Sequence, residues 1–127
     1  MAVLYSEKLL DHFRHPRNYG ALTDADISYE SFNPLCGDRI RVEVKIENKS
    51  VKEVRFKGDG CAISIASASL LTEIILNTDP NKISDDQLIA ALESDIKPAR
   101  IQCALLPLEA LRAGLKIYQE QAHRSSE

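Results

Sequence analysis

The sequence has no tryptophan, no excess of basic residues and no apolar run long enough to cross a membrane. Sixteen Lys and Arg residues against nineteen Asp and Glu residues give a formal net charge of -3. Nucleic acids and anionic membrane surfaces bind basic patches, so this charge balance argues against both as the main partner. The longest stretch without a charged residue, 61–72, is too short to span a bilayer.

There are only three cysteines, and no secretory signal precedes them. Residues 1–4 form a short apolar start, and Glu7 and Lys8 follow closely. An odd number of thiols without an export signal favours a reducing compartment over a disulfide framework. We therefore expect a cytoplasmic protein. Its 127 residues suit a single domain, 1–127, whose core needs no disulfides.

Strand patterns are confined to one part of the chain. Residues 40–47 alternate four apolar with four charged side chains, which is typical of an antiparallel strand with one buried face. A turn at 48–50 predicts a hairpin with a second strand at 51–56, and residues 29–32 supply a third strand. Charged residues of this region, Glu43 among them, are expected on the solvated face.

Helical patterns flank these strands. The sequence predicts helices at 4–14 with Ser6 as N-cap, at 63–76, from Ser84 through Leu92, and at 106–121 with Pro107 in its first turn. The tail at 122–127 is expected to fray. His12 and His15 are expected to face solvent or to cap the first helix. Because strands and helices are segregated, we predict an α+β fold, a small three-stranded antiparallel sheet with helices packed on one face.

Each cysteine lies at a boundary between expected elements. Cys36 lies in a Gly-Asp turn, whereas Cys61 and Cys103 directly precede helices. At helix N-termini the unpaired N–H groups and the helix dipole favour a thiolate. A buried, inert thiol is the ordinary alternative for a free cysteine, but polar turns are poor core material.

Asp38 lies two residues after Cys36, so both side chains can converge on one ion. Three thiolates (Cys36, Cys61 and Cys103) and one carboxylate make the four ligands that a tetrahedral zinc ion or an iron–sulfur cluster requires. The chain has no C-x-x-C, so the spacing is not that of a zinc finger. The alternative for Asp38 is a turn residue that hydrogen-bonds its own backbone.

Three further residues support this candidate site. Gly37 and Gly60 adjoin two of the cysteines and leave open space for a ligand. Arg100 lies close to Cys103, where a cation pairs with a carboxylate or stabilises a thiolate or persulfide. The alternative for Arg100 is an ordinary surface charge.

The cysteine motifs and the N-terminal segment form a specific combination. The motifs are Asn33-Pro34-Leu35-Cys36-Gly37-Asp38, Gly58-Asp59-Gly60-Cys61-Ala62-Ile63-Ser64 with Ala66-Ser67-Ala68-Ser69, and Arg100-Ile101-Gln102-Cys103. The N-terminal segment contains Leu4-Tyr5, Asp11-His12-Phe13 and Pro16-Arg17-Asn18. Over about residues 4–121 the sequence therefore resembles the U-type iron–sulfur cluster scaffolds, which comprise IscU, SufU and the N-terminal domain of NifU.

The resemblance implies a three-stranded sheet with packed helices, as the patterns also predict. It implies that Cys36, Asp38, Cys61 and Cys103 surround one exposed metal or cluster site. It further implies that a cysteine desulfurase delivers sulfur as a persulfide. Cys103 or Cys36 accepts this sulfur, depending on the subgroup.

Two features separate this sequence from typical subgroups. IscU proteins usually carry His before the third cysteine and a Leu-Pro-Pro-Val-Lys motif for a dedicated chaperone, whereas this chain has Gln102 and lacks the motif. The segment at 98–103 looks more like SufU, but the insertion of typical SufU proteins between the second and third cysteines is absent.

Three functions are consistent with this resemblance. The first is a non-enzymatic scaffold that assembles a transient 2Fe–2S cluster from desulfurase-derived sulfur and iron from a donor, then passes it to acceptor proteins. The second is a zinc-dependent sulfurtransferase that accepts persulfide sulfur and activates a cysteine desulfurase. The third is a structural-zinc interaction module without chemistry.

Overall fold

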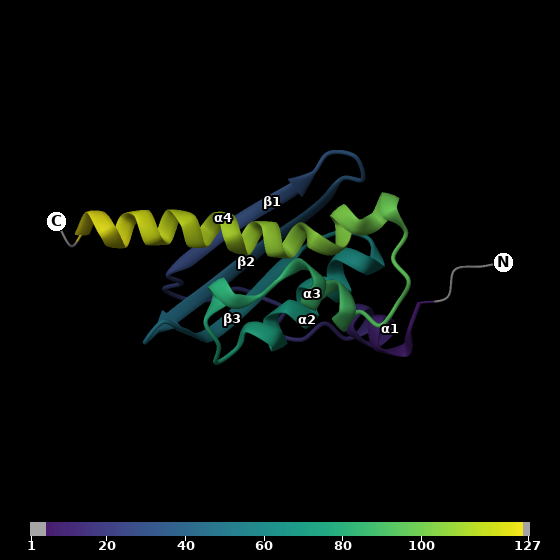
Figure 1. The fold of residues 1–127 in the computed structure, drawn as a ribbon, viewed down its shortest axis with the longest axis horizontal. Helices are drawn as coiled ribbons and strands as arrows, with labels where there is room; N and C mark the ends of the chain where they lie inside the picture. Colours follow the sequence, from purple (N-terminus) through teal and green to yellow (C-terminus); the bar gives the residue numbers. More distant parts are fainter. Residues whose placement is uncertain (1–4, 126–127) are drawn as a thin grey trace.

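The computed structural model describes residues 5–125 and contains a three-stranded antiparallel sheet and four α-helices (Figure 1). The strands, in the spatial order β1-β2-β3, are β1 (Ile27–Asn33), β2 (Asp38–Glu47) and β3 (Ser50–Asp59). The helices are α1 (Glu7–Arg14), α2 (Ala62–Ile75), α3 (Asp85–Ala91) and α4 (Ile101–Ser125), with short 3-10 turns η1 (Pro80–Lys82) and η2 (Pro98–Arg100). The predicted α+β class is confirmed.

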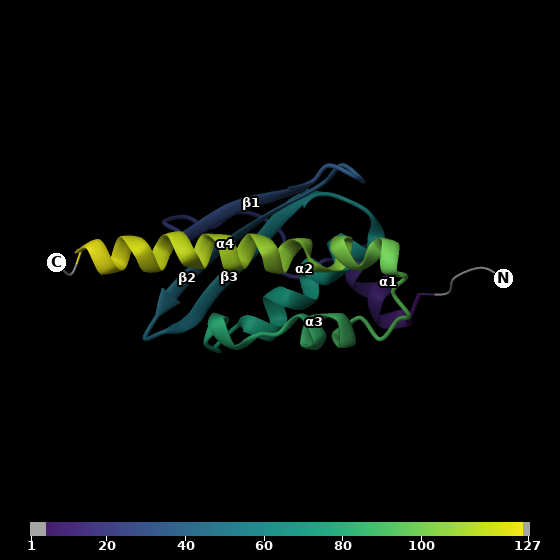
Figure 2. The ribbon, with the colours of Figure 1, turned by 45° about the horizontal axis from the view of Figure 1, so that its top comes forward.

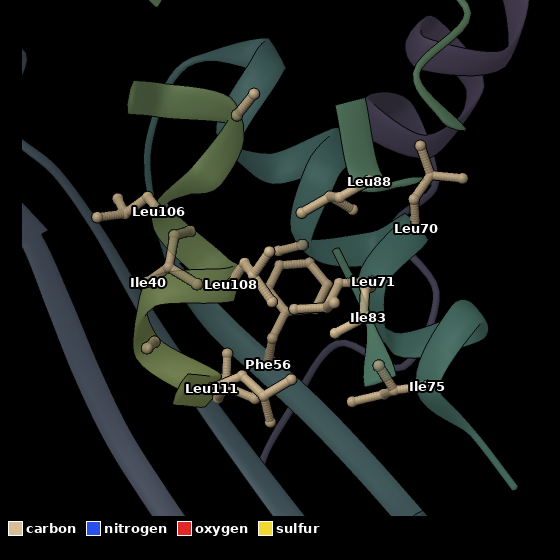
Figure 3. Packing of buried hydrophobic residues seen from close by; sticks show 14 of the residues in the cluster. Ile40, Phe56, Leu70, Leu71, Ile75, Ile83, Leu88, Leu106, Leu108 and Leu111 are labelled. Carbon is tan, nitrogen blue, oxygen red and sulfur yellow. The ribbon is translucent and has the colours of Figure 1, made fainter. Parts of the chain in front are cut away.

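The helices pack on one face of the sheet, as predicted. Helix α4 lies against β1 and β2, and α2 lies against β3 and β2. Figure 2 shows both helices on the same side of the strands, with α3 and α1 packed against the helical layer. The buried core between sheet and helices centres on Phe56, surrounded by Ile40, Leu71, Leu108 and Leu111 (Figure 3). Among the described helices, none is long and apolar enough to span a bilayer.

Serine and alanine side chains let α2 and α4 approach each other closely. Ser64, Ser67 and Ser69 of α2 are fully buried. The Ser67 hydroxyl donates a hydrogen bond to the carbonyl of Ala104 in α4. This contact satisfies a buried polar group and fixes the first turns of α4 against α2.

The opposite face of the sheet is partly covered by the chain itself. Asn18 and Gly20 pair with Phe56 on the free edge of β3, and the chain then crosses to begin β1 on the other edge. On this path the backbone N–H of Leu22 donates to Glu43 Oε1 at 3.3 Å. Glu43 is therefore buried, and its assignment to the solvated face was wrong.

The last helix begins earlier than predicted. Pro98 opens the 3-10 turn η2, which runs directly into α4 at Ile101 instead of Leu106. Pro107 consequently lies inside the helix, where its missing N–H leaves the carbonyl of Cys103 without its usual helical partner. At the other end the helix continues to Ser125, beyond the predicted end at Gln121.

His12 is buried, not solvent-facing or capping. Only 5% of the residue is exposed, because α1 packs His12 against α2. Its Nδ1 lies 2.7 Å from Ser69 Oγ, and its Nε2 lies 3.4 Å from a carboxylate oxygen of Glu73. Ser6 caps α1 as predicted, by accepting a hydrogen bond from the N–H of Leu9. The predicted helix start at Leu4 lies outside the described residues.

Gly58 fixes the pairing of β2 with β3, which brings the start of β2 beside the start of α2. A Cβ atom at Gly58 would lie 2.0 Å from the backbone oxygen of Arg39 in β2. We expect Gly58→Ala to lower the free energy of unfolding by about 3 kcal/mol, because the new Cβ is held rigidly by its own backbone and clashes with a backbone oxygen that cannot rotate away. Chemical denaturation measures the change. As a control, Lys57→Ala at the exposed neighbouring position should change the free energy of unfolding by no more than about 0.5 kcal/mol. Equal effects of the two variants would contradict this role.

The burial of His12 makes stability depend on pH. Desolvation and the nearby Arg17 cation lower the pKa of His12, although Glu73 and Asp11 oppose them. Between this lowered pKa and the unfolded value of about 6.5, the unfolded chain binds a proton that the folded chain does not. The free energy of unfolding should therefore fall as pH is lowered through this window. In urea denaturation at several pH values, His12→Gln should flatten the pH dependence of the free energy of unfolding. His15→Gln, at an exposed position, should preserve that dependence.

Candidate functional site

The turn between β1 and β2 presents Cys36 to solvent. Asn33 holds the turn closed, because its carbonyl accepts the N–H of Gly37 at 2.8 Å and its side chain accepts the N–H of Leu35 at 3.0 Å. Gly37 has φ +77°, a left-handed conformation that favours glycine. No atom lies within 4 Å of the place of a Cβ at Gly37, so the expected open space is present there.

Cys61 is the N-cap residue of α2, and Cys103 lies in the first turn of α4. Cys61 is half-buried, whereas Cys103 exposes only 2% of its surface. The expected boundary positions are confirmed, except that Cys103 lies inside its helix. In Figure 1 the β1–β2 turn and the starts of α2 and α4 lie at the same end of the molecule.

Three of the four predicted ligand residues converge closely. Within the described part of the chain, Cys36, Asp38 and Cys103 place one ligand atom each within 4.8 Å of one another. The Sγ atoms of Cys36 and Cys103 are 3.5 Å apart. The thiol of Cys61 is not in this group and contacts Ser64 Oγ at 3.7 Å. Its backbone N–H nevertheless donates to Asp38 Oδ1 at 3.2 Å.

Asp38 is a buried carboxylate with one unused oxygen. Burial would raise its pKa, but the Cys36 and Cys61 thiols, the Ser64 hydroxyl and the Cys61 amide outweigh it and hold the pKa below the usual value. Among the residues that the structure describes, Asp38 Oδ2 nevertheless has no hydrogen-bond partner. A buried charged oxygen without a partner is costly, so this atom favours binding of a cation.

The pKa of Cys103 is raised, whereas its position near a helix N-terminus predicted a thiolate with a lowered pKa. Burial, followed by the neighbouring thiols of Cys36 and Cys61, raises the pKa of Cys103 to about 12. Desolvation thus outweighs the helix N-terminus, which sequence alone does not reveal. A hydrogen bond with Cys103, together with the charges of Cys61 and Cys103, raises the pKa of Arg100. The Arg100 guanidinium therefore lies beside the Cys103 thiol. The predicted proximity of Arg100 to Cys103 is therefore present.

A cavity of about 440 Å³ opens beside the cysteines. Its lining residues are Asn33, Leu35, Cys36, Ala99, Arg100, Gln102 and Cys103. Gln102, which stands where IscU proteins usually carry His, is thus part of this wall. The cavity leaves room for a small inorganic group in contact with both Cys36 and Cys103.

Sequence reasoning missed Ser64 and misjudged Gly60. A Cβ at Gly60 would lie 2.2 Å from Ser64 Oγ and 3.2 Å from the carboxyl carbon of Asp38. The space beside Gly60 is therefore filled by the protein's own polar groups and is not open for a ligand. Ser64 ends the second cysteine motif, three residues after Cys61, but nothing in the sequence indicates that its side chain lies beside Asp38.

Comparison with known families decides the identity of this fold. Residues 4–125 match the family described as the NifU-like N terminal domain. The chain belongs to this family. The domain is 39% identical to the zinc-dependent sulfurtransferase SufU of Bacillus subtilis, over 88% of this chain and 89% of that protein. It is 36% identical to the iron–sulfur cluster assembly scaffold protein IscU of Aquifex aeolicus, over 100% of this chain and 83% of that protein.

Solved structures share the fold of this NifU-like domain. A candidate iron–sulfur cluster assembly scaffold protein for the SUF system from Fervidobacterium islandicum superimposes with a TM-score of 0.75 at 25% identity, over 87% of this chain and 96% of that one. The N-terminal part of a NifU-like protein from Brucella abortus gives a TM-score of 0.76 at 16% identity, over 91% and 94%. At that identity the second match supports the fold alone.

The three thiols of this domain should react at different rates. In metal-free protein at pH 7.5 we expect iodoacetamide to modify exposed Cys36 first and Cys103 at least about tenfold more slowly, because access and thiolate fraction both control reactivity. Half-buried Cys61 should fall between them. Peptide mass spectrometry over time measures each rate. Equal rates for Cys36 and Cys103 would contradict the burial and raised pKa of Cys103.

Proposed function

We propose that this NifU-like domain is an iron–sulfur cluster assembly scaffold, which builds a 2Fe–2S cluster and transfers it to acceptor proteins. The observation that carries the proposal is that ligand atoms of Cys36, Asp38 and Cys103 lie within 4.8 Å of one another, while Asp38 Oδ2 has no hydrogen-bond partner among the described residues. Soft thiolates beside a buried anionic oxygen are a donor set for iron or zinc. Its family and its 36% identity to an IscU scaffold support the same function.

The proposed ligands are Cys36, Asp38, Cys61 and Cys103. Ligand atoms of Cys36, Asp38 and Cys103 already lie together, and the Cys61 thiol is close enough to lower the pKa of Asp38 and to raise that of Cys103. To bind the same ion, this thiol would give up its long contact of 3.7 Å with Ser64 Oγ.

Three further residues support this set. Arg100 adds a positive charge beside Cys103, and Gly37 adopts the left-handed conformation that the Cys36 turn needs. Gly60 has no Cβ and so lets Ser64 and Asp38 approach closely.

The cluster is cargo in this scheme, and the chain acts as a carrier rather than an enzyme. A cysteine desulfurase supplies sulfur as a persulfide, a separate donor supplies iron, and acceptor proteins remove the finished cluster. Cys36 and Cys103 are the candidate persulfide acceptors. The single domain and the cytoplasmic location stay predictions.

A second candidate function is a zinc-dependent sulfurtransferase that activates a cysteine desulfurase. It is favoured by the 39% identity to SufU of Bacillus subtilis. The same donor set fits zinc, which takes four ligands of the thiolate and carboxylate kind. When bound, zinc would supply a positive charge that keeps its thiol ligands deprotonated. The protein residues would then position an accessible sulfur, most readily Cys36, to attack a persulfide.

One experiment separates the two functions. The full chain is purified without oxygen, assayed for iron, zinc and acid-labile sulfide, and then mixed with a cysteine desulfurase and an apo-ferredoxin. Cluster formation followed by transfer to the ferredoxin supports the scaffold. Tight zinc with faster desulfurase turnover and no cluster supports the sulfurtransferase. Zinc without an effect on either protein rejects both and leaves a structural-zinc module.

Asp38 should make the bound cluster labile. A carboxylate oxygen is a harder ligand than sulfur and holds cluster iron less strongly, which suits a protein that must release its cargo. We expect Asp38→Cys to retain the cluster longer and to slow its transfer to apo-ferredoxin by about tenfold or more. Visible circular dichroism follows the transfer anaerobically.

The matched control places the same new thiol nearby but outside the ligand group. Asp59→Cys at the exposed end of β3 should transfer its cluster at the rate of the unmodified chain. If Asp38→Cys neither slows transfer nor increases retention, the carboxylate is not the source of lability.

A further inference from the structure

Cys36 and Cys103 touch each other but differ in their access to solvent. Cys36 is exposed on the β1–β2 turn, whereas Cys103 exposes 2% of its surface within the first turn of α4. Their Sγ atoms are nevertheless 3.5 Å apart. An exposed and a buried sulfur in direct contact form a short path from the surface into the site.

Solvent access decides where sulfur first arrives. A persulfide carried on a donor protein can reach only those sulfur atoms of this chain that the donor's surface can approach. Cys36 meets this condition, and the open space beside Gly37 leaves its turn free of covering atoms. Cys103 does not, because only 2% of its surface is exposed.

We propose that sulfur enters at Cys36 and passes to Cys103 within the same molecule. This inference rests on the proposed function as a sulfur-accepting scaffold, and it assigns an order to the two acceptors. Cys36 is then the entry residue, and Cys103 is the residue that stores the first sulfur.

The transfer is a thiol–persulfide exchange that needs no added oxidant or reductant. The Cys103 thiol passes its proton to the adjacent Cys36 sulfur, 3.5 Å away, as it attacks the outer sulfur of the Cys36 persulfide, so no free Cys103 thiolate is required. A sulfur–sulfur bond forms at Cys103 as the one at Cys36 breaks, and the proton of Cys103 goes to the released Cys36 sulfur. One persulfide is consumed and one is formed, so electrons balance.

The cavity beside the two cysteines provides the space for this exchange. The outer sulfur of a persulfide lies about 2 Å from the cysteine Sγ. The hollow of about 440 Å³ is lined by both Cys36 and Cys103 and accommodates that atom next to either. Because both partners belong to one chain, the exchange is unimolecular and gains from their high effective concentration.

Storage at Cys103 gives the chain a capacity of two sulfur atoms. Once Cys36 is regenerated, it accepts a second sulfur while the first remains on Cys103. A 2Fe–2S cluster contains two sulfides, so one chain would hold the sulfur for one cluster. Arg100, which lies beside the Cys103 thiol, provides a cation for the stored persulfide anion.

The order of labelling tests the proposal directly. Full-length protein receives glutathione persulfide below one equivalent, is quenched by alkylation at successive times, and is analysed by peptide mass spectrometry. We expect the extra sulfur on Cys36 first and on Cys103 later, at a rate independent of protein concentration. Cys103→Ser and Cys103→Ala should both keep it on Cys36. Cys36→Ser should slow the loading of Cys103 at least about tenfold.

Other outcomes overturn the proposal. Loading of Cys103 in Cys36→Ser at the wild-type rate, or first labelling at Cys61, removes Cys36 as the entry residue. A Cys36–Cys103 disulfide with released sulfide shows attack on the inner sulfur and ends the relay, while sulfur acceptance itself stands. If no cysteine of the wild-type chain gains sulfur, sulfur acceptance fails and the relay fails with it. Circular dichroism confirms that each variant is folded.

Discussion

The hydrogen bond from the Cys61 amide to the Asp38 carboxylate joins two parts of the molecule on which the candidate site depends. It links the first residue of β2 to the N-terminus of α2, where a negative charge is favourable. The pairing of β2 with β3 makes this contact geometrically available, because β3 leads directly into the Gly60–Cys61 connection. It occupies only one carboxylate oxygen and leaves the other, buried and without a partner, for a cation.

The remaining cysteines differ in their exposure to solvent, and this difference suits a site that loads and unloads. Cys103 is fixed in α4, whose first turns are bound to α2 through the Ser67 hydroxyl. Cys36 lies on a short exposed turn with an unobstructed glycine beside it. An exposed sulfur at the surface and a buried sulfur beneath it allow exchange with partner proteins without disturbing the core.

Local patterns in the sequence were enough to predict the sheet, the helical layer and the boundary positions of the cysteines. The alternation at 40–47 and the small residues of 63–76 each report directly on a buried face. The burial of His12 and Glu43 could not be predicted, because it comes from α1 packing on α2 and from a segment that crosses the sheet. The raised pKa of Cys103 likewise arises from tertiary burial, and no sequence signal shows that the Cys61 thiol lies outside the group of ligand atoms within 4.8 Å of one another.

The convergence of four residues on one ion is tested most directly by X-ray absorption at the zinc edge of the zinc-loaded protein. The proposed ligand set predicts three sulfur neighbours at about 2.3 Å and one oxygen at about 2.0–2.2 Å. Cys61→Ser should reduce the sulfur count to two. Two sulfurs in the unmodified protein, unchanged in Cys61→Ser, would show that Cys61 does not join Cys36, Asp38 and Cys103.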